Sequence, residues 1–390
     1  MDGARYFEDG RLVIFRRSAG YYARIRTQVS PVKYVWRSLS TTDVEKAISL
    51  GRKLLFQLEH RADQGFPTKS RLFSTVIDDY IAYRQRDHVH GKTSKGMMKQ
   101  IVRVSKFWRE YAGGLAVEAI DDKVMREFIP WRRDYYLHFE KLPKNAKLHP
   151  ADKTLQWDMM LGKAIVRRAQ EQGLRGKLAL PTATFTAKNK RARPAFEISE
   201  YRRLWRTMRK RISDAGHSRA RRSREILRDY VLVLANSGMR VGEANNLKLR
   251  DVMPFRDAKG RNNFRFVVRG KTGERDVILR SAAARRVDKI LARRTGENPQ
   301  DFLFAMPKGT RIISLNDQFN AVLKQGGIER NGFGEKYSLY SLRHFYAVMA
   351  LRNGIGIFEV ARNMGTSVQM IQQYYGKQAT ASVFATRLGD

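Results

Sequence analysis

The chain has 390 residues, 42% of them hydrophobic, which predicts two or three folded domains. Its 76 Lys and Arg residues against 38 Asp and Glu leave a net charge of +38, which favours a polyanionic partner, nucleic acid first of all. Because the chain has no cysteine, no histidines at ligand spacing and no apolar run of about 18 residues, disulfides and thiol nucleophiles are excluded, and we expect no metal, cofactor or membrane segment.

Residues 1–66 predict a small three-stranded sheet with one helix, which begins at a capping box formed by Thr42 and Glu45. A sheet of this kind is a common way to lay a ribbon in a DNA groove, and a small α+β cap of unknown purpose is an equally good interpretation. The strands are expected at Leu12–Phe15, Tyr21–Arg26 and Tyr34–Arg37.

Residues 67–181 predict a helical domain, because apolar residues recur there at helical spacing. Helices are expected from Phe73, over Met97–Trp108, after Asp122 and over Thr154–Gln170. Cations on the outer faces would by default be solvated, but the excess of one sign favours contact with phosphate. The candidate DNA-binding residues here are Lys95, Lys99, Arg103 and Lys106, with Arg132 and Arg133 on a further helix.

Residues 182–195 predict a linker, because they lack periodicity and end at Pro194. A cationic linker between two basic domains would let the protein close around a duplex as a clamp. Its candidate DNA-binding residues are Lys188, Lys190, Arg191 and Arg193.

Residues 196–390 predict a further, mostly helical domain, with Ser199 as the cap of its first helix. A hydrophobic helix is expected to break at Ser237 and Gly238, and a second helix to start near Arg240. Glu243 lies three residues after Arg240 and can hold its guanidinium, although an exposed ion pair is the ordinary interpretation.

Three further segments carry candidate functional groups. Residues 264–280 alternate as two strands around a turn with Lys271 at its tip, where it could act as a proton donor. The run Tyr340-Ser-Leu-Arg343-His344 opens a helix, and the turn at 364–368 opens another that reaches Tyr374 and Tyr375.

The order and spacing of these segments resemble the catalytic domain of the tyrosine recombinases, the phage integrase family. That family has an Arg-x-x-Glu helix, a hairpin lysine, a His-or-Tyr-x-x-Arg-His segment, and a Gly-His-or-Thr turn that precedes a tyrosine by ten residues. Counting ten residues from Gly365 selects Tyr375 over Tyr374. The resemblance covers residues 196–390, and the earlier parts resemble the core-binding and arm-binding domains only in size, order and charge.

The resemblance implies a mainly α fold with small β elements (α+β) and a role for each matching residue. Arg240 and Arg343 would stabilise the pentacovalent phosphate, since guanidiniums bind two oxygens in a planar fork and keep their charge. Tyr375 would be the nucleophile and Lys271 the acid that protonates the leaving 5′ oxygen, with Glu243 as support. Tyr340 and Thr366 stand where many members have histidine or, at the second position, tryptophan, so the base that activates the nucleophile stays unnamed.

The resemblance also implies a site-specific DNA recombinase or integrase of a phage or mobile element, located in the cytoplasm and on the nucleoid when bound to DNA. It would work through a 3′-phosphotyrosine on double-stranded DNA, as a homotetramer on two DNA sites and as a monomer or dimer in solution. A DNA-bending accessory protein is left open. Two alternatives are a sequence-specific DNA-binding protein that does not cut and a relaxing enzyme of the type IB topoisomerase kind.

Overall fold

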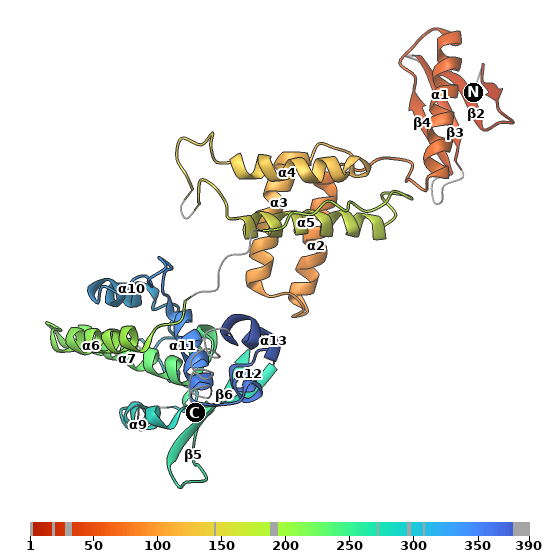
Figure 1. Cartoon of the computed structure of the whole chain (residues 1–390). Helices are drawn as coiled ribbons and strands as arrows, with labels where there is room; N and C mark the ends of the chain where they lie inside the picture. Colours follow the sequence, from red (N-terminus) through yellow and green to blue (C-terminus); the bar gives the residue numbers. More distant parts are fainter. Residues whose placement is uncertain are drawn as a thin grey trace. The chain divides into compact units, whose positions relative to one another are not determined.

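The computed structural model of the chain consists of two compact units, Met1–Asn189 and Lys190–Asp390. Each unit is mainly helical and contains one small antiparallel sheet, which confirms the predicted α+β fold class (Figure 1). Among the described residues, no helix is both long and apolar enough to cross a membrane. The structure describes residues 3–17, 20–27, 33–143, 146–187, 194–270, 273–294, 298–306 and 309–376.

The first unit begins with a sheet of strand order β1-β2-β3-β4, covered on one face by helix α1 (Figure 1). The strands that the sequence predicts are present, and an additional short edge strand, β1, lacks the apolar run that would have announced it. Asp43, and not Thr42, caps α1, since its carboxylate accepts the backbone N–H groups of Glu45 and Lys46. The elements are β1 (Arg5–Phe7), β2 (Leu12–Arg17), β3 (Gly20–Arg26), β4 (Tyr34–Ser38) and α1 (Val44–Asp63).

A bundle of helices with its own hydrophobic core follows, as predicted. Trp108 stacks on Phe128 at the centre of this core, with ring centroids 3.8 Å apart. A Cβ atom added at Gly162 would lie 2.2 Å from the Trp108 ring, so glycine is what lets the second and fourth helices of the bundle approach closely. The elements are α2 (Phe73–Val89), α3 (Lys95–Ala112), η1 (Val117–Ala119), α4 (Asp122–Asp134) and α5 (Asp152–Glu171).

The second unit packs helices around a sheet of strand order β5-β6-β7. Its first helix, α6, begins at a capping box between Glu197 and Glu200, so the predicted cap at Ser199 is wrong. The predicted hairpin is β6 with β7, and β5 is an additional strand that pairs with the other edge of β6. The helices are α6 (Ile198–Ser213), α7 (Ser218–Ser237), α8 (Val241–Ala244), α9 (Ala284–Ala292), α10 (Asn316–Gln325), α11 (Leu339–Arg352), α12 (Ile357–Met364) and α13 (Val368–Ile371). The other elements are η2 (Leu249–Asp251), β5 (Val252–Arg256), β6 (Asn262–Gly270), β7 (Gly273–Ile278), η3 (Ser281–Ala283) and the π-helical turn η4 (Gln372–Gly376).

Helices α7 and α11 lie against each other in the core of this unit and position the segments that the sequence singled out. Almost every side chain of α11 from Leu339 to Val348 is buried. Such a helix has no solvent-facing side, so polar groups on it must find partners inside the protein. One of these groups is the guanidinium of Arg343.

Candidate active site

Arg343 is buried on α11 and donates from Nη1 to the carbonyl oxygen of Gly238, at 2.6 Å. Gly238 is the left-handed cap of α7, with φ of 67°, and a Cβ atom there would lie 2.4 Å from the ring of Tyr346. The carbonyl end of a helix carries partial negative charge, which suits a buried cation. Arg343 is therefore bound at the helix break that was predicted at Ser237 and Gly238.

Arg240 lies two residues after this cap and serves as the N-cap of α8. Its backbone N–H donates to Oε2 of Glu243 and its Nη1 to Oε1 of Glu243, both at 2.8 Å. Its Nη2 donates to the carbonyl oxygen of Gly365, at 2.6 Å. Gly365 is the left-handed cap of α12, so each of the two predicted arginines binds a glycine carbonyl at the end of a helix.

Arg275 on β7 completes the cluster and was not predicted. Its two terminal nitrogens donate to the two oxygens of Glu243, at 2.9 and 2.8 Å, and Nη2 also donates to the carbonyl of Met364, at 3.0 Å. A Cβ atom at Gly365 would lie 2.5 Å from Nε of Arg275, so the guanidinium occupies the space that a side chain at Gly365 would need. In the sequence, Arg275 is one of several charges in the second strand of a hairpin, and no local signal distinguishes it.

Glu243 holds both Arg240 and Arg275 with a carboxylate whose side chain is only 4% exposed. Burial opposes its ionisation, but hydrogen bonds from Arg275 and Arg240 outweigh burial and lower its pKa from 4.5 to about 2. Glu243 is thus ionised at neutral pH and fixes two guanidiniums at once. The predicted Arg240–Glu243 contact is present, and it is a partly buried interaction instead of an ordinary exposed ion pair.

Asn363 was also missed, and its side chain ties the same elements together. Its Nδ2 donates to the carbonyl of Ser237, at 3.1 Å, and to the hydroxyl of Tyr346, at 2.7 Å, while its Oδ1 accepts the N–H of Ile278, at 2.7 Å. The ends of α7, β7 and α12 are therefore held next to one another beside the arginines.

Two of the other predicted site residues, Tyr340 and Thr366, lie within the described residues. The rings of Tyr340 and His344 make an edge-on contact on α11, with centroids 5.0 Å apart. Thr366 follows Gly365 directly and donates its backbone N–H to Ala361, at 3.0 Å. Lys271 lies outside the described residues. Tyr375 lies in the turn η4, which contacts α11, and its side chain is outside what the structure describes.

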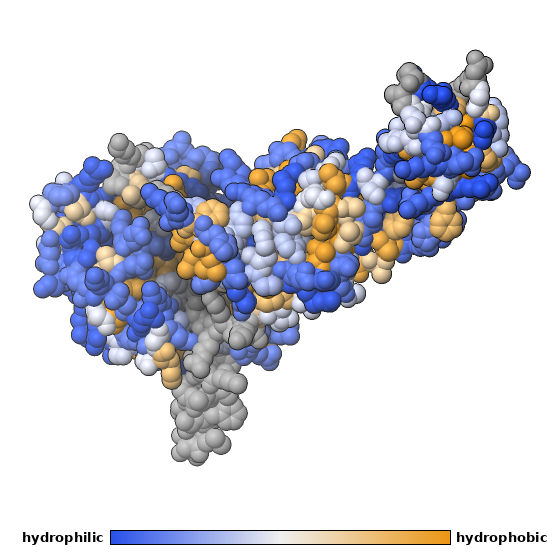
Figure 2. Space-filling model, turned by 90° about the horizontal axis from the view of Figure 1, so that it is seen from above, coloured by the Kyte–Doolittle hydropathy of each residue, from blue (hydrophilic) through white to orange (hydrophobic). Residues whose placement is uncertain are grey.

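The candidate DNA-binding residues divide into two groups. Figure 2 shows a face of the molecule on which hydrophilic residues cover most of the visible surface. The predicted residues on α3 of the helical bundle are all exposed. They are Lys95, Lys99, Arg103 and Lys106. Arg133 on α4 is also exposed, but the prediction that Arg132 lies on an outer face is wrong, because its side chain is buried against Asp158. The residues of the linker, Lys188, Lys190, Arg191 and Arg193, lie outside the described residues.

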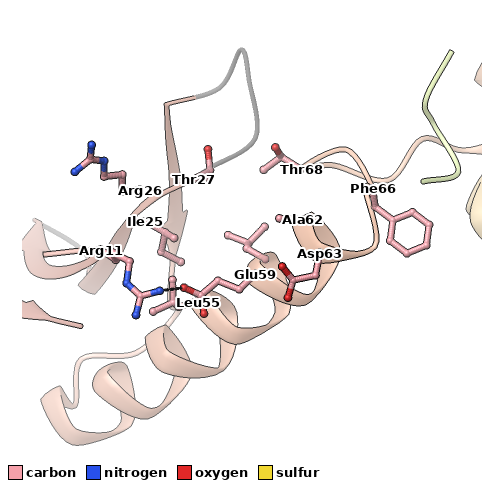
Figure 3. A pocket seen from close by; sticks show the side chains of 11 residues that line it. Arg11, Ile25, Arg26, Thr27, Leu55, Glu59, Ala62, Asp63, Phe66 and Thr68 are labelled. Carbon is pink, nitrogen blue, oxygen red and sulfur yellow. Dashed lines mark hydrogen bonds and ion pairs between the residues drawn. The ribbon is translucent and has the colours of Figure 1, made fainter. Parts of the chain in front are cut away.

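A pocket in the first unit is unrelated to the arginine cluster. It lies between the sheet and the second half of α1, with Ile25 and Leu55 in its wall and an ion pair of Arg11 with Glu59 beside it (Figure 3). None of its lining residues is a predicted site residue. The described part of the chain also has no group of three or more His, Asp or Glu side chains that could hold a metal.

Stability should depend on the ionisation of Glu243. Its folded pKa lies below its ordinary value, so its contribution is present above pH 4.5 and is lost as pH falls towards 2. The difference corresponds to about 3 kcal/mol of unfolding free energy. Urea denaturation of the wild type and of Glu243→Gln at pH 6, 4 and 3 should show the wild type more stable at pH 6 and the difference in unfolding free energy reduced by about half at pH 3. A gap that stays constant with pH would contradict this role.

Comparisons with known proteins identify the family and the fold. The model of the phage integrase family matches residues 197–381, and a search of curated proteins found no match. Among solved structures, a lambda integrase dimer bound to a COC′ core site is similar with a TM-score of 0.56 and 16% identity, over 95% of this chain and 96% of that one. The Tn1549 transposon integrase in complex with transposon right end DNA has a TM-score of 0.56 and 13% identity, over 82% and 100%.

A third similar structure is the XerH site-specific recombinase bound to difH substrate, with a TM-score of 0.52 and 16% identity over 86% of each chain. At identities of 13–16%, these structural similarities show the fold alone. The family is shown by the family model, which matches residues 197–381. The segment that holds Arg240, Glu243, Arg275 and Arg343, residues 197–381, belongs to the phage integrase family of tyrosine recombinases.

Proposed function

We propose that the protein is a site-specific DNA recombinase, an integrase of a phage or other mobile element, that cleaves and rejoins DNA through a 3′-phosphotyrosine. The observation that carries the proposal is the convergence of Arg240 and Arg343. They lie 103 positions apart in the sequence. Each is held by the carbonyl oxygen of a glycine that caps a helix, Gly365 for Arg240 and Gly238 for Arg343. Two fixed guanidiniums suit a phosphodiester whose two non-bridging oxygens gain charge during substitution.

The proposed reaction needs no metal and no external energy source. The phenolic oxygen of Tyr375 attacks the phosphorus, the bond from phosphorus to the 5′ oxygen breaks, and a 3′-phosphotyrosyl bond forms. Lys271 gives a proton to the leaving 5′ oxygen, and the phenol gives up its proton to a base. The new ester conserves the energy of the broken bond, so a second 5′ hydroxyl can reverse the step.

The arginines perform two tasks in this scheme. Their charge favours the phenolate form of Tyr375, which otherwise has a pKa of about 10. They also stabilise the pentacovalent state, where one preorganised donor is typically worth about 2.7–4 kcal/mol. Tyr340 and Thr366 complete the proposed site, and Glu243 and Arg275 keep Arg240 in place.

The charge of +38 supports duplex DNA as the partner of both units. We propose that residues 67–181 bind the core site, that the linker 182–195 lets the protein close around it, and that four copies assemble on two DNA sites. The protein would then be found in the cytoplasm, on nucleoid DNA.

The amino-terminal residues, 1–66, are proposed to bind a second, arm-type DNA site through the sheet face opposite α1. Ala23 and Ile25 are buried under α1, so their neighbours on β3 face the other way. There the guanidinium of Arg24 lies over the rings of Tyr34 and Trp36, at 5.3 and 5.8 Å. An open face that combines arginine with exposed aromatic rings suits contact with phosphates and bases.

The central prediction is a covalent adduct on Tyr375. Nicked duplexes of randomised sequence should trap a covalent complex, and mass spectrometry should place the DNA on Tyr375. Tyr375→Phe should abolish the adduct, while the matched variant Tyr374→Phe should retain it. DNA binding without any adduct would favour the non-cutting alternative, and relaxation of any supercoiled plasmid by a monomer would favour the topoisomerase alternative.

Arg275→Ala should slow formation of the covalent complex by about tenfold to a hundredfold, the size expected when a catalytic group is displaced by about 1 Å. Affinity for DNA should change much less, because Arg275 is held by protein groups. The matched control is Arg265→Ala on β6 of the same hairpin, whose partner Asp276 lies on the surface. Equal cleavage rates in the two variants would show that Arg275 does not position the site.

Arg24→Ala combined with Trp36→Ala should weaken binding of a second duplex by full-length protein already saturated with core DNA. The loss should be about tenfold or more, since base stacking on an aromatic ring is worth about 1–3 kcal/mol. Arg52→Ala on α1 is the control on the covered side of the sheet. Unchanged binding of a second duplex by the double variant would show that the sheet face opposite α1 does not bind DNA.

A further inference from the structure

A fully buried carboxylate in the helical bundle holds two arginines, and one of them reaches the surface. The side chain of Asp158 on α5 is 0% exposed. Its Oδ2 accepts a hydrogen bond from Nε of Arg132 on α4, at 3.1 Å, and its Oδ1 accepts one from Nη2 of Arg103 on α3, at 3.3 Å. The carboxylate therefore links three helices through charged groups.

The close contact of α3 with α5 explains how Arg103 reaches Asp158. Gly162 leaves room for the Trp108 ring, and Nε1 of Trp108 donates to the backbone carbonyl of Asp158, at 2.8 Å. The backbones of the two helices are thereby fixed next to each other. Arg103, about one and a half turns before Trp108 on α3, can then reach across the contact between α3 and α5 to the carboxylate of Asp158.

The charges of Asp158, Arg132 and Arg103 do not cancel. The side chain of Arg132 is 3% exposed, and its guanidinium lies 3.6 Å from the centre of the Phe107 ring and already neutralises Asp158. Its Nη1 is buried and has no hydrogen-bond partner within the described residues. Arg103 adds a second positive charge, so two guanidiniums on one carboxylate leave a net charge of +1. Structural pairing would need only Arg132, because a further cation adds repulsion and desolvation.

Arg103 is held in place and is still accessible. Its side chain is 40% exposed, and besides Asp158 it binds Oε1 of Gln100 through Nε, at 3.0 Å. These two bonds restrict a long side chain that would otherwise lose considerable rotamer entropy on binding a ligand. Lys99 and Lys106 are exposed on the same helix, four residues before and three after Arg103, and Lys106 also pairs with Glu110 at 3.6 Å, so the surface around Arg103 has a net positive charge.

We propose that Arg103 is a preorganised phosphate-binding site on α3, that its ligand is a backbone phosphate of duplex DNA, and that buried Asp158 is the residue that positions it. The inference rests on the proposed function only in taking duplex DNA as the partner. Asp158 acts through Arg103 and does not touch DNA. The arginine fork then gives a fixed point of contact, whereas the neighbouring lysines supply mobile charge.

The test is a double-mutant cycle on DNA binding by the full chain, with a mixed-sequence duplex of about 40 base pairs and a series of salt concentrations. Arg103→Ala should lower the slope of log affinity against log salt by about 0.9, the value for one phosphate contact. Asp158→Asn should weaken binding about fivefold in the wild type and have almost no effect when Arg103 is already alanine. Lys106→Ala should also lower the slope but should show no coupling to Asp158→Asn.

If Asp158→Asn does not fold, Gln100→Ala replaces it, since Gln100 is the other anchor of Arg103 and lies on the surface. Here too the effect should disappear when Arg103 is alanine. An unchanged salt slope for Arg103→Ala, or equal effects of the anchor variant in both backgrounds, overturns the inference. Salt-independent binding by the wild type would instead contradict the proposed function as a whole.

Discussion

The arrangement of the candidate site depends on one buried carboxylate, that of Glu243. It accepts hydrogen bonds from the guanidiniums of Arg240 and Arg275, and from the backbone of Arg240. Without it, the two guanidiniums would lie close together with no acidic partner, and the charge of Arg275, whose side chain is 15% exposed, would be costly to leave unpaired. The same contact joins α8 to the hairpin strand β7. A change in the position of β7 would therefore also displace the guanidinium of Arg240.

Two glycines complete this arrangement by leaving space that no other residue would leave. Gly238 and Gly365 have φ values of 67° and 62° and cap α7 and α12, and each offers its carbonyl to one arginine. Their missing side chains let Tyr346 and Arg275 come close. The site is thus assembled from helix ends, where backbone carbonyls already favour cations, and it needs few additional acidic residues in a strongly basic chain.

Features set by neighbouring residues could be predicted from the sequence, and features set by distant residues could not. The contact of Arg240 with Glu243 was predicted because three residues separate them, and the break at Gly238 because glycine ends helices. The caps at Thr42 and Ser199 were wrong because other acceptors, Asp43 and Glu197, stand within two residues of each.

Arg275 and the pairing of Asp158 with Arg132 and Arg103 were missed for a different reason. Each partner lies 26 or more residues away along the chain, and only the tertiary fold selects it from many charges of the same sign. The edge strands β1 and β5 were missed because pairing with a neighbouring strand, more than their own composition, defines them. In both cases the decisive information lies in packing.

The most direct measurement is a structure of the full chain trapped on a nicked duplex. In that structure one phosphate should be joined to the phenolic oxygen of Tyr375 and should accept hydrogen bonds from both Arg240 and Arg343. Glu243 should still bridge Arg240 and Arg275 in that complex. A phosphate joined to Tyr374, or one that only a single arginine reaches, would contradict the proposed function.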